Sequence, residues 1–201
     1  MLFDFGGVLS EEGFRMGLYH IASLNAVDPD KFFTTAQSLI FSSGYIMGRC
    51  SEAFFWDQLR AITGIHGSNE EFKNIILERF ILREWMVDLA KKLKHASIRT
   101  AILSDQTNWL DELDERLHFF FLFESIFNSY HQGKSKNDPS LFDDVLSYMK
   151  LKPGETLFID DTLGNVERAR LKGLNAFHFV DRVQFLGEMK IFFPELNLAN
   201  Q

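Results

Sequence analysis

The chain has 201 residues, of which 46% are hydrophobic and 24% are charged, and this composition is typical of a globular protein with one core. The net charge is -7, with 28 acidic and 21 basic residues and no basic run, which argues against nucleic acid as a partner. The single cysteine excludes an intrachain disulfide, and without a long apolar run or a secretory signal pattern we expect no membrane segment and a cytoplasmic location.

The first predicted element is the end of a buried strand at 1–5, which Gly6 and Gly7 break. From about residue 11 to residue 80 the pattern is helical and contains no convincing strand. Helix starts within it are Asp28-Pro29, Ser51 and the capping-box spacing Ser68–Glu71. We therefore predict a four-helix insertion at 11–80.

Beyond residue 80, predicted helices alternate with short apolar strands. The predicted strands are 98–103, 125–128, 156–160 and 175–180, and the predicted helices are 85–93, 111–117, 138–149 and 166–172. This alternation predicts an α/β fold with a parallel, doubly wound sheet, on which ligands bind beyond the carboxyl ends of the strands. The predicted core domain therefore comprises 1–10 and 81–201, and the insertion is a second, helical domain.

Two polar clusters follow the first two predicted strands. Asp4, followed by paired glycines, offers a carboxylate beside an accessible backbone, although a simple strand-to-loop turn has the same appearance. Ser104 and Asp105 follow the next strand, where a hydroxyl and backbone amides can bind a phosphate oxygen. A helix cap is the alternative interpretation of this second cluster.

Two further clusters lie in the last third of the chain. Lys136, in the segment 133–139, can neutralise a phosphoryl group or a carboxylate, but lone lysines are usually solvated. Asp160 and Asp161 end an apolar strand and are followed by Asn165. Adjacent carboxylates repel each other unless a cation lies between them, and oxygen ligands of this kind suit Mg²⁺. A solvated acidic turn is the alternative.

In their order and placement, the four clusters together resemble the motifs of the haloacid dehalogenase-like hydrolases, from Asp4 to about Val180. The matching residues are Asp4-Phe5-Gly6-Gly7-Val8 for the first motif, Ser104 for the second, Lys136 with Asp138-Pro139 for the third, and Asp160-Asp161 with Asn165 for the fourth. The helical insertion resembles the C1-type cap of this family, a mobile lid over the active site. The resemblance thus implies a Rossmann-like core with an inserted helical-bundle cap.

The resemblance also implies a magnesium-dependent phosphatase of a small phosphorylated metabolite. Asp4 is expected to attack phosphorus and form an aspartyl-phosphate, while Lys136 neutralises the charge shared by Asp4 and the phosphate. The expected substrate-binding residues are Ser104, the backbone N–H of Asp105, and Asn165, which orients the others. The expected metal ligands are Asp4, the backbone carbonyl of Gly6, Asp161 directly, and Asp160 mostly through a bound water.

The chain departs from the family pattern at Gly6, where phosphatases of the family usually carry a second aspartate that shuttles protons. We therefore expect a slow phosphatase that favours good leaving groups, such as anomeric sugar phosphates. Ser10, Glu11 and Glu12 are possible substitutes for the missing carboxyl group.

Two alternative functions remain open at this point. One is a catalytically silent member that binds a phosphate ligand or a protein partner, which Gly6 favours. The other is a 2-haloacid dehalogenase, against which the paired Asp160 and Asp161 argue. Candidate substrate contacts in the helical insertion are Tyr19, Tyr45, Trp56 and Arg60, each of which is equally compatible with the core or the surface. The sequence does not indicate an oligomeric state.

Overall fold

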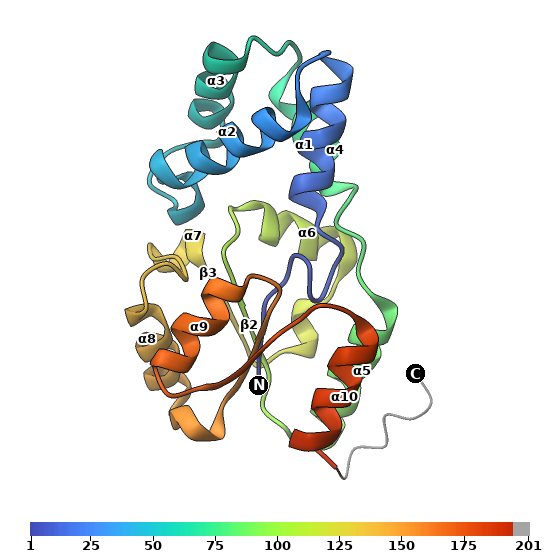
Figure 1. Cartoon of the computed structure of the whole chain (residues 1–201), viewed down its shortest axis with the longest axis vertical. Helices are drawn as coiled ribbons and strands as arrows, with labels where there is room; N and C mark the ends of the chain where they lie inside the picture. Colours follow the sequence, from blue (N-terminus) through green and yellow to red (C-terminus); the bar gives the residue numbers. More distant parts are fainter. Residues whose placement is uncertain (195–201) are drawn as a thin grey trace.

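A five-stranded parallel sheet forms the lower lobe of the protein, whose computed structural model describes residues 1–194 (Figure 1). Its strands are β1 (Leu2–Phe3), β2 (Ala101–Ser104), β3 (Ser125–Asn128), β4 (Leu157–Asp160) and β5 (Asn175–His178). They lie in the order β3-β2-β1-β4-β5, and every neighbouring pair is parallel. The predicted α/β class with a parallel sheet is confirmed, and the short β1 lies at the centre.

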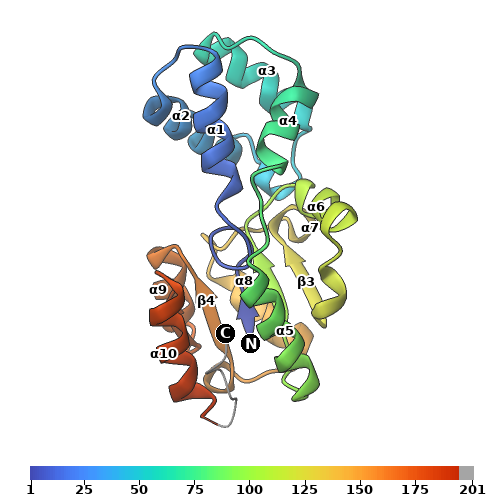
Figure 2. The same cartoon turned by 90° about the vertical axis from the view of Figure 1, so that its right-hand side faces the viewer.

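Helices cover both faces of the sheet (Figure 2). They are α5 (Glu84–His95), α6 (Trp109–Leu117), α7 (Ser129–Gln132), α8 (Ser140–Met149), α9 (Leu163–Leu171) and α10 (Arg182–Phe192), with short 3-10 turns η2 (Phe120–Leu122) and η3 (Pro153–Glu155). Successive strand residues point to opposite faces. Leu2 packs in a cluster with α8 and α9, whereas Phe3 packs in a second cluster with α5, α6 and α10. The sheet is therefore doubly wound.

Four helices make up the upper lobe (Figure 1). They are α1 (Gly13–Leu24), α2 (Pro29–Ser42), α3 (Glu52–Thr63) and α4 (Asn69–Leu77), with the 3-10 turn η1 (Tyr45–Met47) after α2. The three predicted helix starts are confirmed: Asp28 caps α2, Ser51 caps α3, and Ser68 forms a capping box with Glu71 at α4. The domain boundaries at residues 10 and 81 remain a prediction.

Some element bounds differ from the predicted ones. Helix α9 begins at Leu163 instead of residue 166. The weak helix formers Gly164 and Asn165 occupy its first turn and hide this start in the sequence. Helix α10 was not predicted, since only Phe185 and Met189 of its residues are buried and its apolar periodicity is weak. The predicted strand at 98–103 is shorter and begins at Ala101.

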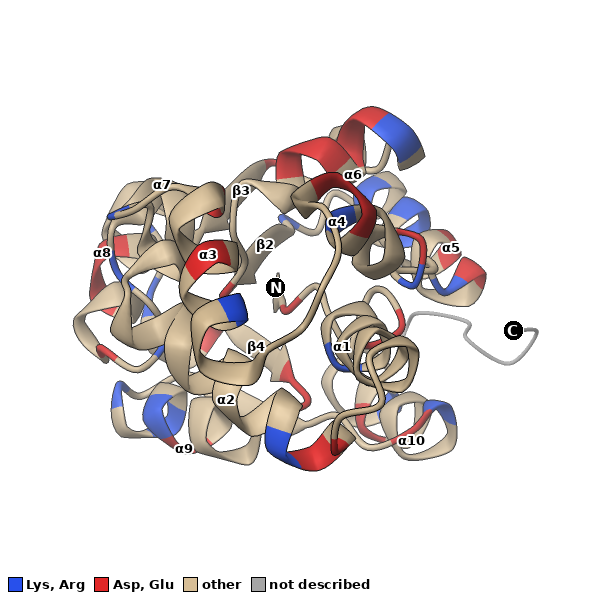
Figure 3. Ribbon diagram, turned by 90° about the horizontal axis from the view of Figure 1, so that it is seen from above, with Lys and Arg blue, Asp and Glu red and all other residues tan. Residues whose placement is uncertain are grey.

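Two chain segments connect the lobes and pair with each other. The Glu11 N–H donates to the Ile81 carbonyl at 2.9 Å, the Arg83 N–H donates to the Leu9 carbonyl at 2.9 Å, and Ser10 forms an antiparallel bridge with Leu82. Seen from above, α1 to α4 lie over the carboxyl ends of the strands (Figure 3). Among residues 1–194, no helix combines the length and apolar character needed to cross a bilayer.

Candidate active site

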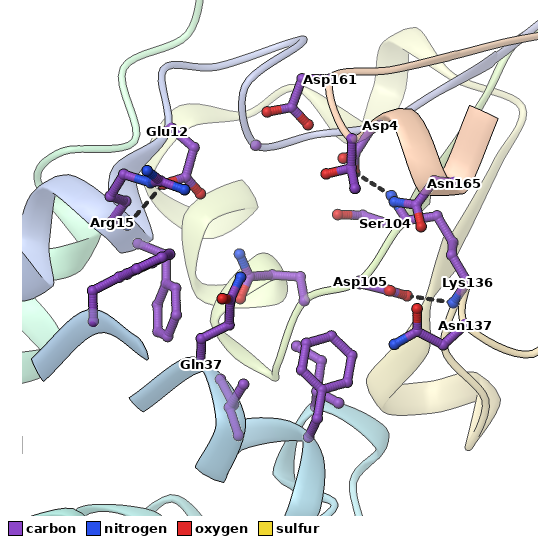
Figure 4. A pocket seen from close by; sticks show the side chains of 18 of the residues that line it. Asp4, Glu12, Arg15, Gln37, Ser104, Asp105, Lys136, Asn137, Asp161 and Asn165 are labelled. Carbon is purple, nitrogen blue, oxygen red and sulfur yellow. Dashed lines mark hydrogen bonds and ion pairs between the residues drawn. The ribbon is translucent and has the colours of Figure 1, made fainter. Parts of the chain in front are cut away.

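A cavity of about 820 Å³ lies where the two lobes meet. Asp4 directly follows β1, Ser104 ends β2, and Asp160 ends β4, so the parallel strands bring these three residues to one edge of the sheet. The chain reverses its direction across the sheet between β1 and β4, and crevices at such points are the usual ligand sites of doubly wound folds. Asp4, Ser104, Lys136 and Asp161 line the sheet side of the cavity (Figure 4).

Lys136 joins two carboxylates of the site. Its Nζ lies 3.0 Å from Oδ1 of Asp4 and 2.6 Å from Oδ2 of Asp160. The Lys136 side chain is 1% exposed and that of Asp160 is 0% exposed. Burial alone would lower the pKa of Lys136, but the carboxylates of Asp160, Asp4 and Asp105 outweigh it and hold that pKa well above its ordinary value. Lys136 is therefore a permanent cation beside Asp4.

Asp160 is fixed by donors on both of its carboxylate oxygens. Oδ1 accepts the Thr162 N–H at 2.8 Å, and the Asn165 side-chain amide lies 3.1 Å from Oδ1 and 3.0 Å from Oδ2. Together with Lys136, these contacts satisfy a carboxylate that has no access to solvent. Asp160 is thus built into the wall of the site and positions Lys136.

Asp4, Asp160 and Asp161 form an acidic group that fits a divalent cation. Each offers one carboxylate oxygen, and these oxygens lie within 4.8 Å of one another. Burial raises the pKa of Asp4; the charges of Asp160 and Asp161 raise this pKa further, and the charge of Lys136 opposes the shift. Burial also raises the pKa of Asp161. A cation between these oxygens would offset this cost, and an all-oxygen donor set is the kind that Mg²⁺ prefers.

Gly7 makes room for the Asp161 carboxylate. A Cβ on Gly7 would lie 2.2 Å from Oδ2 of Asp161, and Gly7 has a φ of +79°, which favours glycine. Gly6 differs, because a Cβ there would be no closer than 3.4 Å to Phe80. A side chain at position 7 would therefore displace Asp161, whereas a side chain at position 6 can be accommodated in ordinary contact with Phe80.

Ser104 and Asp105 lie beside Asp4 and Lys136 respectively. Ser104 is buried and lines the cavity next to Asp4 (Figure 4). Oδ1 of Asp105 accepts the Lys136 backbone N–H at 2.8 Å, so this carboxylate is committed to the Lys136 loop. Burial raises the pKa of Asp105, although Lys136 opposes the shift. The structure thus brings together every site residue named from the sequence: Asp4, Gly6, Ser104, Asp105, Lys136, Asp160, Asp161 and Asn165.

Two arginines that the sequence analysis did not single out hold the site together. Arg168 donates from Nε to the Lys136 carbonyl at 2.7 Å and from Nη2 to Oδ1 of Asn165 at 2.6 Å. Arg83 donates to the Gly7 carbonyl at 2.5 Å and fixes the loop after Asp4. The position of Arg168 three residues after Asn165 on one helix was the available signal, since such residues share a face.

The helical side of the cavity is lined by α1 with its N-cap residue, by α2 and by η1. Its residues are Glu12, Phe14, Arg15, Phe33, Thr34, Gln37, Ser38, Ile40, Phe41, Ser42 and Ile46. The four substrate-contact candidates from the sequence are wrong, because none of them lines this cavity. Tyr45 and Trp56 are buried in the core, Tyr19 donates to Asp30, and Arg60 binds the Gly67 carbonyl.

Comparisons with known proteins agree with this geometry. A family model described as haloacid dehalogenase-like hydrolase matches residues 51–171. Bifunctional epoxide hydrolase 2 of Rattus norvegicus is 32% identical over 133 residues, which cover 61% of this chain and 23% of the rat protein. The sesquiterpene phosphatase astK of Aspergillus oryzae is 27% identical over 106 residues, which cover 52% of this chain and 54% of the fungal protein. The chain therefore spans only a quarter to a half of these relatives.

Among solved structures, a HAD family enzyme from Bacteroides thetaiotaomicron resembles this chain over nearly its whole length. That enzyme, in complex with magnesium and inorganic phosphate, aligns with a TM-score of 0.73 and 23% identity, covering 92% of this chain and 96% of its own. A likeness at this level of identity shows a common fold.

Proposed function

Because the chain belongs to the haloacid dehalogenase-like hydrolases, we propose that it is a magnesium-dependent phosphatase that forms an aspartyl-phosphate on Asp4. The observation that carries the proposal is the grouping of Asp4, Asp160 and Asp161 within 4.8 Å at the cavity edge, with Lys136 in contact with Asp4. A carboxylate can act as the nucleophile that forms an aspartyl-phosphate, and a neighbouring lysine can stabilise the charge of the phosphoryl group during transfer.

In this proposal the cation would be held by Asp4, Asp161 and the backbone carbonyl of Gly6, and Asp160 would contribute through a bound water. Bound Mg²⁺ would offset the repulsion between the Asp4 carboxylate and the anionic phosphate. The magnesium and phosphate present in the Bacteroides enzyme of the same fold support magnesium as the cation and a phosphate group as the substrate's reacting part.

The protein residues supply positioning and charge. An Asp4 oxygen attacks phosphorus, and the bond to the substrate's ester oxygen breaks. Ser104 and the backbone N–H of Asp105 hold phosphoryl oxygens, and Asn165 keeps Asp160 and hence Lys136 in place. Water then attacks the aspartyl-phosphate, which releases inorganic phosphate and restores Asp4.

The size and lining of the cavity support the proposal that the substrate is an organic phosphate ester. At about 820 Å³ it is far larger than a phosphate ion, and its helical side combines the rings of Phe33 and Phe41 with polar Gln37. A small phosphorylated metabolite, such as a sugar phosphate, suits this mixed lining. The curated relative from Aspergillus, a sesquiterpene phosphatase, supports phosphate ester chemistry.

A silent, ligand-binding protein is the second candidate, and Gly6 is the observation that favours it. The two are separated by measuring phosphate release from a panel of sugar phosphates and one aryl phosphate. Turnover that requires Mg²⁺ and is abolished by chelator and by Asp4→Asn supports the phosphatase. Binding of Mg²⁺ and phosphate esters without turnover would instead support the silent protein.

A further inference from the structure

Phosphatases of this family usually carry a proton-transferring aspartate at the position of Gly6, and this chain has no side chain there. Gly6 has no side chain, yet a leaving alkoxide needs a proton, and a water that attacks the aspartyl-phosphate must lose one. General acid–base help of this kind is worth about 10²–10⁴-fold in rate. The question is which nearby group carries the proton.

Ser10 and Glu11 are committed to other partners. The Ser10 hydroxyl is fully buried and lies 2.9 Å from the Glu11 carbonyl, to which it donates. Both Glu11 oxygens accept from Arg83 at 3.1 Å, and these hydrogen bonds lower the pKa of Glu11. Neither side chain lines the cavity.

Glu12 is placed differently. Its Oε1 lies 3.9 Å from the position that a Cβ on Gly6 would occupy, so its carboxylate reaches the region that a longer residue 6 would enter. Its Oε2 accepts the Arg15 N–H at 2.8 Å, because Glu12 is the N-cap of α1, and this bond fixes the side chain at the cavity wall (Figure 4). Oε2 anchors the carboxylate, and within residues 1–194 Oε1 makes no hydrogen bond and can contact a ligand.

The surroundings of Glu12 favour a carboxyl group that holds a proton. Burial raises the pKa of Glu12, while the Arg15 N–H and the Arg15 charge oppose the shift. Carboxyl groups with raised pKa values serve as general acids near neutral pH.

We propose that Glu12 is the catalytic acid and base of this active site, in place of the carboxyl group absent at Gly6. The proposal rests on the phosphatase function above. As Asp4 bonds to phosphorus and the ester P–O bond breaks, the Glu12 proton passes to the leaving oxygen. In the second step the Glu12 carboxylate takes a proton from water while that water's oxygen bonds to phosphorus and the P–O bond to Asp4 breaks. Each turnover therefore returns Glu12 to its protonated form.

The test compares Glu12→Gln with wild type on two substrates. Glycerol phosphate has a poor leaving group that needs a proton, whereas 4-nitrophenyl phosphate does not. We expect kcat/KM to fall by about 10²–10⁴-fold for glycerol phosphate and far less for the aryl ester. In wild type, kcat/KM for glycerol phosphate should decline as pH rises through the Glu12 pKa, and this limb should vanish in Glu12→Gln. Glu115→Gln, an exposed change on α6, is the matched control.

The double variant Gly6→Asp, Glu12→Gln distinguishes lost chemistry from damaged structure. Gly6 is absent from the positive-φ residues, and a Cβ there would be in ordinary contact with Phe80 at 3.4 Å. An aspartate at this position can therefore supply the proton and should restore much of the glycerol phosphate activity. If the wild type turns over both substrates and Glu12→Gln leaves both rates unchanged, the role of Glu12 is overturned but the phosphatase proposal is not. Absence of any wild-type turnover dependent on Asp4 and Mg²⁺ overturns the phosphatase proposal and this one with it.

Discussion

The Lys136 ammonium lies 3.0 Å from the Asp4 carboxylate, although the two residues are far apart in the sequence. Lys136 also contacts Asp160 at 2.6 Å, so one cation serves two buried carboxylates. A buried charge is costly without a partner. This pair therefore links the stability of the protein to the integrity of the proposed nucleophile.

Replacing Lys136 with methionine should both destabilise the protein and stop catalysis. The change leaves Asp4 and Asp160 buried without their cation, at a cost of about 3–5 kcal/mol in the free energy of unfolding. Lys134→Met is the matched control, because Lys134 pairs with Asp144 at the surface, where such a pair contributes little to stability. Urea unfolding of both variants measures the difference, and equal losses would contradict our account of Lys136.

Gly7→Ala should weaken Mg²⁺ binding. The new Cβ would collide with the Asp161 carboxylate at 2.2 Å and displace a proposed ligand. Gly133→Ala has a similar positive φ of +67° but nothing within 4 Å of its Cβ, so it carries the backbone strain without the collision. Titration calorimetry with Mg²⁺ should show weaker binding in Gly7→Ala and unchanged binding in Gly133→Ala. Equal affinities in all three proteins would exclude Asp161 as a ligand.

Asp105→Asn should increase the stability of the protein at neutral pH. Burial raises the pKa of Asp105 in the folded state above its ordinary value of 3.8, so the folded state binds the proton more tightly than the unfolded state. The corresponding stability is present below about pH 3.8 and is lost as pH rises through the folded-state pKa. Asparagine does not ionise, so the variant should gain in Tm over wild type as pH increases from the acid range to 7.

Asp138→Asn is the control of opposite sign. The Ser140 hydrogen bonds lower the pKa of the exposed Asp138, which therefore contributes stability at neutral pH that is lost as pH falls. Its asparagine variant should lose Tm at neutral pH and approach wild type in acid. If the Asp105 variant also lost Tm at neutral pH, burial would not be the main influence on the pKa of Asp105.

The sequence was sufficient to predict the sheet and the gathering of polar residues at its edge. Asp4 and Asp160 each follow an apolar stretch, and parallel strands bring the residues after their carboxyl ends together. The helix starts at Asp28, Ser51 and Ser68 were equally readable, since capping is a local interaction within three residues.

Side-chain direction was not predictable in the same way. The sequence pattern of the insertion does not show whether an aromatic residue such as Tyr45 or Trp56 points into the core or into the cavity. The choice among Ser10, Glu11 and Glu12 depends on the turn at Gly7 and on the distant Arg83, which engages Glu11. Arg168 likewise acquires its role only when α9 packs beside the Lys136 loop.

The most direct test of the account is to detect phosphate on Asp4. Wild-type protein is mixed with Mg²⁺ and 4-nitrophenyl phosphate, quenched in acid within its first turnovers, and examined by intact and peptide mass spectrometry. We predict a phosphoryl adduct on the peptide that contains Asp4, and no adduct in Asp4→Asn or with chelator. Phosphate release by the wild type without any adduct on Asp4, or the same adduct in Asp4→Asn, would contradict Asp4 as the nucleophile.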